Sequence, residues 1–186
     1  MLPAVDVGKS VSRVGGEAKR ATYRAVAGDL KLAYAQFEEL ETFARFGARL
    51  DADTQKSIEH GRRIRACLKQ PEFMPVSVPA QIMVLLALSA GLFDEVPLAR
   101  MPDAGRAVEQ AAASIPAQVS ARFASADRLS DEDRKAVVAI ATKALAAFQP
   151  KPDDNAEPKP DDQAKPKPDD KDAPKPEPES SGKEGS

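Results

Sequence analysis

The sequence predicts an all-α protein, a helical bundle followed by a disordered tail. Apolar residues recur every three or four positions through residues 17–148, and no segment shows the sustained alternation with a period of two that a half-buried strand requires. Hydrophobic residues make up 42% of the 186 residues, enough for one domain with a sizeable core. We expect a connecting segment at residues 1–16, a helical domain at 17–149 and a tail at 150–186.

Two helices are expected in the first half. In residues 17–46 the apolar side chains keep a helical spacing, with charged residues between them. These apolar residues are Val26, Leu30, Ala33, Phe37, Leu40 and Ala44. Gly47 is a typical C-terminal stop, and Asp51 or Asp53 can cap a second helix that ends before Pro71.

A third helix is expected to form the centre of the core. Residues 71–79 contain three prolines, which prevent a continuous helix because each lacks an amide donor. Residues 79–90 are apolar on every side, which is typical of a buried helix, and Gly91 is placed to end it.

The helical pattern weakens over residues 101–123 and is interrupted at Pro116. Ser130 with Asp133 three residues later resembles a capping box, which predicts the start of a last helix. The apolar face of that helix is expected to contain Val137, Ile140, Ala144 and Phe148.

The tail at residues 150–186 has alanine as its only hydrophobic residue type and repeats Lys-Pro-Asp-Asp units. It cannot bury enough apolar area to offset the entropy of ordering, so disorder with polyproline character is expected. It is either a solubilising tail or an extended ligand for a basic or proline-binding partner. Because the tail has 7 Lys against 11 Asp and Glu, the overall charge of −2 leaves about +2 for the rest, which does not indicate a nucleic-acid partner.

Several other classes of site are disfavoured. A single cysteine excludes an internal disulfide and fits a reducing compartment. His60 and Cys67 lack partners at metal-ligand spacing, so no metal site is expected and each is interpreted as a surface or core residue. The charges of Arg62, Arg63 and Arg65 are interpreted as a solvated helix face. The longest apolar run, seven residues, is far below the roughly 18 needed to span a bilayer, so direct membrane insertion is not expected.

Residues 3–16 read P-A-V-D-V-G-K-S-V-S-R-V-G-G, which surrounds one arginine, Arg13, with small residues. Gly8-Lys9-Ser10 looks like the end of a P-loop, but Pro3 stands where a P-loop needs its first glycine. No phosphate-binding site within this chain is therefore expected.

This run resembles the segment that joins the nucleotide-binding domain to the C-terminal helical domain in the alpha subunit of F-type ATP synthases. The resemblance covers residues 3–148 and includes Y-R-A-V-A-G-D-L at 23–30, A-Q-F-E-E-L at 35–40, F-A-R-F-G at 43–47 and L-K-Q-P at 68–71. Such a subunit carries a beta-barrel and a P-loop domain before this point, so we expect a C-terminal piece. Gly8-Lys9-Ser10 together with Arg49 looks more like the alternate, sodium-linked bacterial enzymes than the housekeeping type.

The resemblance implies roles for four residues. Arg13 would be an arginine finger that acts in trans on the gamma-phosphate bound by the neighbouring beta subunit, with Val11 and Ser12 positioning it. By residue type alone, Arg13 would be a solvated linker arginine. Gln70 lies where the family places glutamines near the adenine of a non-catalytic nucleotide, but Glu72 replaces the second glutamine, so a polar loop is the preferred interpretation.

The resemblance also implies partners and location. These are the beta and gamma subunits, with the loop at residues 46–51 near gamma, although Arg49 stands where the family usually has an acid. MgATP or MgADP would be bound in the assembled complex, with no cofactor held by this chain alone. The complex would lie on the cytoplasmic side of the bacterial plasma membrane and couple ATP synthesis to proton or sodium transport. As such a subunit, this chain would hold no complete active site of its own. Two alternatives remain open: a free-standing helical interaction or assembly module, and a non-functional gene fragment.

Overall fold

The computed structural model describes residues 5, 7, 10, 14–45, 50–124 and 129–150. The chain divides into two units, Met1–Asn155 and Ala156–Ser186, and all described residues belong to the first. Within these ranges the chain forms helices and turns without strands, which confirms the all-α prediction. The predicted stop at Gly47 and the predicted disorder of the tail lie outside the described residues.

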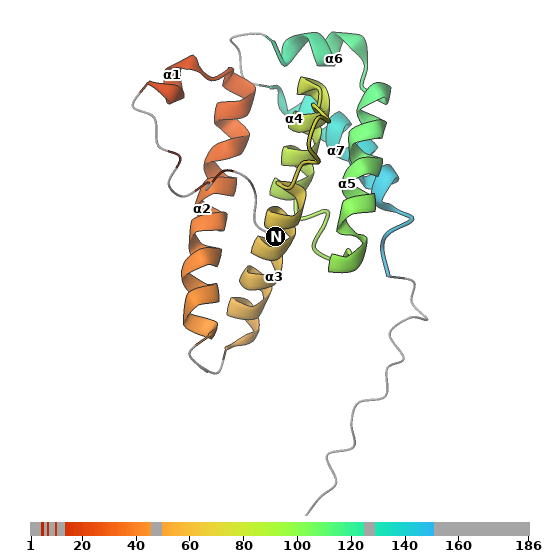
Figure 1. Ribbon diagram of the computed structural model, residues 1–186. Coiled ribbons are helices and arrows are strands. Elements are labelled where there is room, and N and C mark those ends of the chain that lie inside the picture. The colour runs from red at the N-terminus through yellow and green to blue at the C-terminus, as the bar shows by residue number, and fades with distance from the viewer. Residues whose placement is uncertain are drawn as a thin grey trace, which may run out of the picture. The chain divides into compact units, whose positions relative to one another are not determined.

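The α-helices are α1 (Gly15–Ala18), α2 (Ala21–Ala44), α3 (Ala52–Cys67), α4 (Val78–Ser89), α5 (Met101–Ala111), α6 (Ala117–Arg122) and α7 (Asp131–Leu145). Two 3-10 turns, Leu98–Arg100 and Ala112–Ser114, flank α5. Figure 1 shows α2 and α3 side by side, with α4 between this pair and α5. Helix α7 packs on both α4 and α5, so α4 is the central element of the bundle.

The first predicted helix is divided into two pieces. The sequence pattern favoured one helix from residue 17, but the backbone is extended at Lys19 and Arg20 (ψ 142° and 144°), which separates α1 from α2. Arg24 donates to the carbonyl oxygens of Glu17 (3.4 Å) and Lys19 (3.2 Å). These hydrogen bonds serve carbonyl groups that the break leaves without a backbone amide partner in a helix. From there α2 buries Val26, Leu30, Tyr34 and Phe37 at the predicted helical spacing.

Caps begin the following helices as the sequence predicted. The Asp51 carboxylate accepts a hydrogen bond from the Thr54 amide at 2.7 Å, and this bond lowers the pKa of Asp51. Ser130 accepts from the Asp133 amide at 3.1 Å and begins α7. The break predicted at Pro116 separates α6 from the turn that ends α5.

Helix α4 is buried on most of its surface, which confirms the prediction of a central apolar helix. Its buried residues are Ala80, Ile82, Met83, Val84, Leu86, Ala87 and Leu88. The helix begins at Val78, one residue before the predicted start at Pro79, and Ser77 caps it. Pro79 is accommodated because it lies in the first turn, where its missing amide costs no hydrogen bond. Gly91 follows the helix with φ +69°, a conformation that disfavours residues with a Cβ atom.

None of the helices over the described residues combines the length and the apolar character needed to cross a bilayer.

Candidate functional site

The predicted site residues Arg13, Val11 and Ser12 lie outside the described residues. The structure does describe both flanks of this run, at Val7 and Ser10 on one side and from Val14 on the other. The site can therefore be built from the contacts that hold these flanks on the helical domain.

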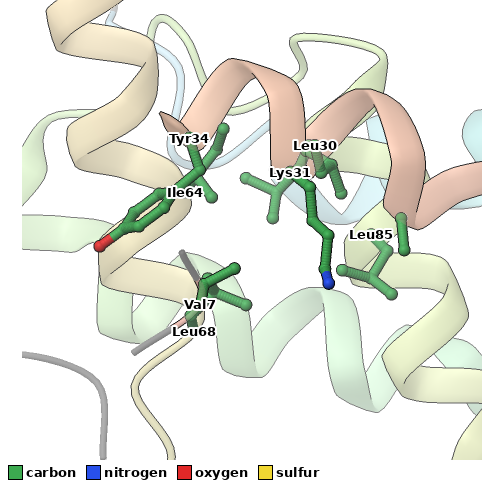
Figure 2. A pocket seen from close by; sticks show the side chains of 9 residues that line it. Val7, Leu30, Lys31, Tyr34, Ile64, Leu68 and Leu85 are labelled. Atoms are coloured by element: carbon green, nitrogen blue, oxygen red, sulfur yellow. The ribbon is translucent and has the colours of Figure 1, made fainter. Parts of the chain in front are cut away.

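Val7 contributes to an apolar hollow between three helices, which we call the α2–α3–α4 groove. The groove has a volume of about 130 Å³ and is lined, besides Val7, by Ala27, Leu30, Lys31, Tyr34, Ile64, Leu68, Leu85 and Leu88. Figure 2 shows Val7 beside Leu68 at the end of α3, with Leu85 of α4 on the opposite side. Val7 is partly buried and packs against the core. Complete burial of a valine contributes about 1.5–3 kcal/mol, so partial burial holds this flank by about 1 kcal/mol.

Lys31 of α2 provides a polar contact to the same flank. Its ammonium group lies 3.5 Å from the Ser10 carbonyl oxygen, longer than the roughly 2.7–3.2 Å of typical hydrogen bonds, so this polar contact is weak. The aliphatic stem of Lys31 lines the groove, as long basic side chains commonly do when they bury the stem and keep the charge in water. One side chain of α2 therefore contacts the segment and also forms part of its groove.

The flank after Arg13 has more exposed side chains. Val14 is 73% exposed, and α1 buries no residue. The ion pair between Arg24 and Glu17 has an N–O distance of 4.0 Å and exposed side chains, so its contribution to stability is small. The hydrogen bonds from Arg24 to backbone carbonyls are the better contacts between α1 and α2.

The α2–α3 pair supports this site. Arg65 donates two hydrogen bonds to the Glu41 carboxylate, at 2.7 and 3.1 Å, and its guanidinium carbon lies 4.4 Å from the centre of the Phe37 ring. The hydrogen bond from Arg65 lowers the pKa of Glu41 and raises that of Arg65 itself. Gly61 allows α3 to pack closely against Phe37 of α2, because a Cβ atom at this position would lie only 2.0 Å from Phe37 Cγ.

The interpretation of three arginines as a solvated face is wrong for two of them. Arg62 is 46% exposed, as expected, but the side chains of Arg63 and Arg65 are only 12% and 17% exposed. Arg63 donates to the Val96 carbonyl oxygen at 3.1 Å and so ties α3 to the loop after α4. A run of like charges in the sequence does not show which members have partners on another helix.

Gln70 lies at the end of α3, where its amide donates to the Met74 carbonyl oxygen at 2.6 Å. It lines a hollow of about 250 Å³ between the end of α3, the start of α4 and Glu109 of α5. This volume is below the roughly 300–1,000 Å³ of pockets that enclose small-molecule ligands. The contact agrees with the polar-loop interpretation, and a role near a nucleotide remains a prediction.

Gln81 is a contact residue that the sequence reasoning missed. It accepts a hydrogen bond from the Tyr23 hydroxyl at 2.7 Å and donates to the Val76 carbonyl oxygen at 2.7 Å, which joins the start of α2 to the loop before α4. Burial raises the pKa of Tyr23, and the nearby Arg20 charge opposes that shift. A glutamine within an otherwise apolar run was the signal that could have revealed it.

His60 contacts an acidic residue, and Cys67 is a free thiol. The His60 Nδ1 atom lies 2.6 Å from an Asp94 carboxylate oxygen, so the ring links α3 to the loop after α4. Burial raises the pKa of the Cys67 thiol to about 12, which keeps it protonated and unreactive at neutral pH. Over the described part of the molecule, no three His, Cys, Asp or Glu residues lie closely enough together to bind a metal ion.

Comparisons with known proteins agree with this domain structure. A family model described as the ATP synthase alpha/beta chain, C terminal domain, matches residues 20–144. Curated relatives named ATP synthase subunit alpha 2 are 74% identical over 153 residues in Albidiferax ferrireducens and 66% identical over 155 residues in Polaromonas naphthalenivorans. A relative named ATP synthase subunit alpha 1 in Marinomonas is 63% identical over 153 residues. These matches cover 82–83% of this chain but only 29–30% of each relative.

Proposed function

Since this protein belongs to the family of C-terminal domains of ATP synthase alpha and beta subunits, we propose that it works as the C-terminal part of an ATP synthase alpha subunit. Its contribution to ATP synthesis and hydrolysis is Arg13, which acts in trans on the nucleotide bound by a neighbouring beta subunit. Through the complex, this chemistry is coupled to proton or sodium transport.

One observation carries this proposal: the run that contains Arg13 is flanked by contacts with the helical domain of a known family. Val7 lies in the α2–α3–α4 groove, Lys31 contacts Ser10, and Arg24 contacts α1. The similarity to relatives named alpha subunits extends over about four-fifths of the chain. These features favour an arginine presented from a folded domain over one in a freely moving linker.

A guanidinium suits the proposed chemistry. It stays charged at all physiological pH values and presents donors in a rigid planar fork. During phosphoryl transfer, negative charge spreads over the equatorial oxygens, and a correctly placed arginine stabilises that charge more in the transition state than in the ground state. The small residues around Arg13 would allow close approach to another subunit.

The remaining roles follow from the same proposal. MgATP or MgADP is held by the assembled complex rather than by this chain alone, and Gln70 is at most a peripheral contact. The partners are the beta and gamma subunits, with the loop at residues 46–51 directed to gamma. The complex is peripheral on the cytoplasmic side of the plasma membrane.

The test uses a chimeric alpha subunit. The matching 153 residues of the Albidiferax relative are replaced by those of this chain, and the chimera is assembled with the other subunits of that enzyme. Arg13→Ala should lower steady-state ATP turnover about a thousand-fold while assembly and single-site nucleotide binding are kept. Arg13→Lys should not restore turnover, because one ammonium group cannot reproduce the planar fork.

Arg134→Ala is the matched control, since it removes an exposed arginine on α7 and should leave turnover unchanged. Near-normal turnover in Arg13→Ala would reject the finger and favour a helical assembly module. Loss of assembly together with turnover would assign Arg13 a structural role.

A further inference from the structure

We propose that Val7 and Lys31 are positioning residues for Arg13, an inference that rests on the function proposed above. They fix the connecting segment on the α2–α3–α4 groove before the run that contains Arg13 begins. Their role is to restrict where the guanidinium can be presented, without contact with the nucleotide.

The two valines in this part of the segment show why Val7 is singled out. Val5 is 65% exposed, whereas Val7, two residues later, lines the groove and packs against the core. The segment therefore has one apolar residue on the domain surface and another directed to solvent within a short distance. Among the described residues before Arg13, Val7 is the apolar anchor.

Lys31 adds a directional contact to this apolar anchor. Its stem lines the groove, and its ammonium group reaches the Ser10 carbonyl oxygen at 3.5 Å. The two contacts lie three residues apart in the segment and use one groove, so together they restrict the position of the segment along α2 more than either contact alone. An apolar contact alone would allow the segment to slide.

The short distance along the chain transmits this restriction to Arg13. Only two residues separate Ser10 from Arg13, and an extended chain advances at most about 3.3–3.6 Å per residue, so the Arg13 Cα lies within roughly 11 Å of the Ser10 Cα. On its other side Arg13 precedes Val14, which is exposed and gives little hold. On the N-terminal side of Arg13, the described contacts that restrict the segment are those of Val7 and Lys31. A misplacement of about 1 Å in a catalytic group can lower a rate about a hundred-fold, so modest anchors can have large effects.

Trypsin provides a direct test on the protein as it exists, because Lys9 and Arg13 are both cleavage sites within the segment. A protease binds several residues on each side of the cleaved bond in an extended form, so we expect cleavage at these sites to become faster when the Val7 and Lys31 contacts open. Val7→Ser should increase cleavage after Lys9 and Arg13 about five-fold, because it removes apolar contact. Val5→Ser is the matched control and should leave both rates unchanged.

The contact of Lys31 is tested in the same assay. Lys31→Met keeps the apolar stem and removes the donor, so it should increase cleavage at the same two sites about two-fold. Lys31→Arg keeps a donor and should leave the cleavage rate of the wild-type protein unchanged. Lys135→Met, on the exposed surface of α7, should also have no effect on this rate. Cleavage elsewhere in the helical domain and the thermal midpoint should stay constant in every variant.

Equal rates for Val7→Ser and Val5→Ser would overturn the proposal. It would also be overturned if cleavage increased at all sites together with a lower thermal midpoint, since this would show a structural role. In the chimeric enzyme, Val7→Ser should lower kcat with KM unchanged. If Val7→Ser speeds cleavage but Arg13→Ala leaves turnover normal, the groove contact is supported and the arginine-finger role is rejected. If Arg13→Ala abolishes turnover but Val7→Ser changes neither kcat nor cleavage, the arginine-finger role is supported and the positioning role is rejected.

Discussion

The α2–α3 pair and the α4–α5–α7 group are held together by different kinds of contact. Between α2 and α3 the contacts include a charged pair, Arg65 with Glu41, and the close approach of Gly61 to Phe37. The buried residues of α4, α5 and α7 are apolar except for Asp133 at the start of α7, whose carboxylate pairs with Arg122 of α6. Both regions are equally helical, so secondary structure alone does not distinguish them.

The difference matters because the two kinds of contact respond to different changes. Aliphatic packing has no direction and depends on the area and volume that it fills. The residues that fill the second region with no more than 2% exposure include Ile82, Met83, Leu86, Leu88, Val108, Val137, Ala141 and Leu145. In the α2–α3 pair, by contrast, a single atom or a single proton can alter the interface. The groove for the connecting segment is built partly on this more sensitive pair.

The largest effect is expected for Leu86→Ala in the centre of α4. Leu86 is 2% exposed, and removal of a buried leucine side chain leaves a cavity that costs about 2–5 kcal/mol of unfolding free energy. Urea unfolding followed by circular dichroism measures this loss, which should be the same at low and high salt. Leu32→Ala, at a leucine that is 62% exposed on α2, should change the stability by less than about 0.5 kcal/mol. A loss below about 1 kcal/mol for Leu86→Ala would contradict dense packing around α4.

The next largest effect is expected for Gly61→Ala, which should lower the unfolding free energy by about 2 kcal/mol. The added Cβ would lie 2.0 Å from Phe37 Cγ and 2.3 Å from Phe37 Cβ, so α2 and α3 must separate. Gly28→Ala, on exposed surface of α2 with no atom within 4 Å of the added carbon, should instead raise stability by about 0.5–1 kcal/mol. If packing against Phe37 requires glycine at position 61, thermal unfolding will show a stability change of opposite sign in the two variants. A gain in both would show that α2 and α3 are less closely packed.

A smaller loss is expected when the charged pair is broken. Arg65→Met should cost about 1–2 kcal/mol, because it leaves the largely buried Glu41 carboxylate without its two hydrogen bonds. A double-mutant cycle with Glu41→Gln should give a coupling energy of about 1 kcal/mol. The control Arg62→Met removes a more exposed partner of Glu59 and should cost less than about 0.5 kcal/mol. Equal losses for Arg62 and Arg65 would mean that the Arg65 contact contributes no more than a surface pair.

The smallest effect is a change in the pH dependence of stability. The hydrogen bond from Arg65 lowers the pKa of Glu41 below its usual 4.5 in the folded state. A lowered folded pKa means that the stabilisation is complete above the unfolded pKa and is lost as the pH falls through the folded pKa. Unfolding free energy should therefore decrease from about pH 5 towards pH 3, less steeply in Glu41→Gln than in the wild-type protein. The exposed control Glu39→Gln should keep the wild-type slope, and an unchanged slope in Glu41→Gln would argue against the Arg65 contact.

Much of the fold could be predicted because its signals are local. Asp51 and Ser130 act as caps through atoms three residues away, and Gly91 ends α4 through its own backbone conformation. The break between α1 and α2 was missed because it depends on Arg24 bonding to carbonyl groups outside its own helix. For the candidate site, the sequence identified Arg13 by resemblance but offered no reason to choose Val7 or Lys31, since neither residue type is unusual in its position.

By itself, the sequence determined the helical class, the positions of most helix ends, the central apolar helix and the resemblance that indicates the family. Period, capping and proline placement act over a few residues, so the sequence expresses them directly. The tertiary structure decided which charges became buried, as with Arg63 and Arg65, and which glycine meets an aromatic ring. It also placed Val7 in a groove whose lining comes from three helices distant in sequence. Such contacts depend on how helices pack in space, and a periodic pattern along one helix carries no information about the side chains that its neighbours bring to it.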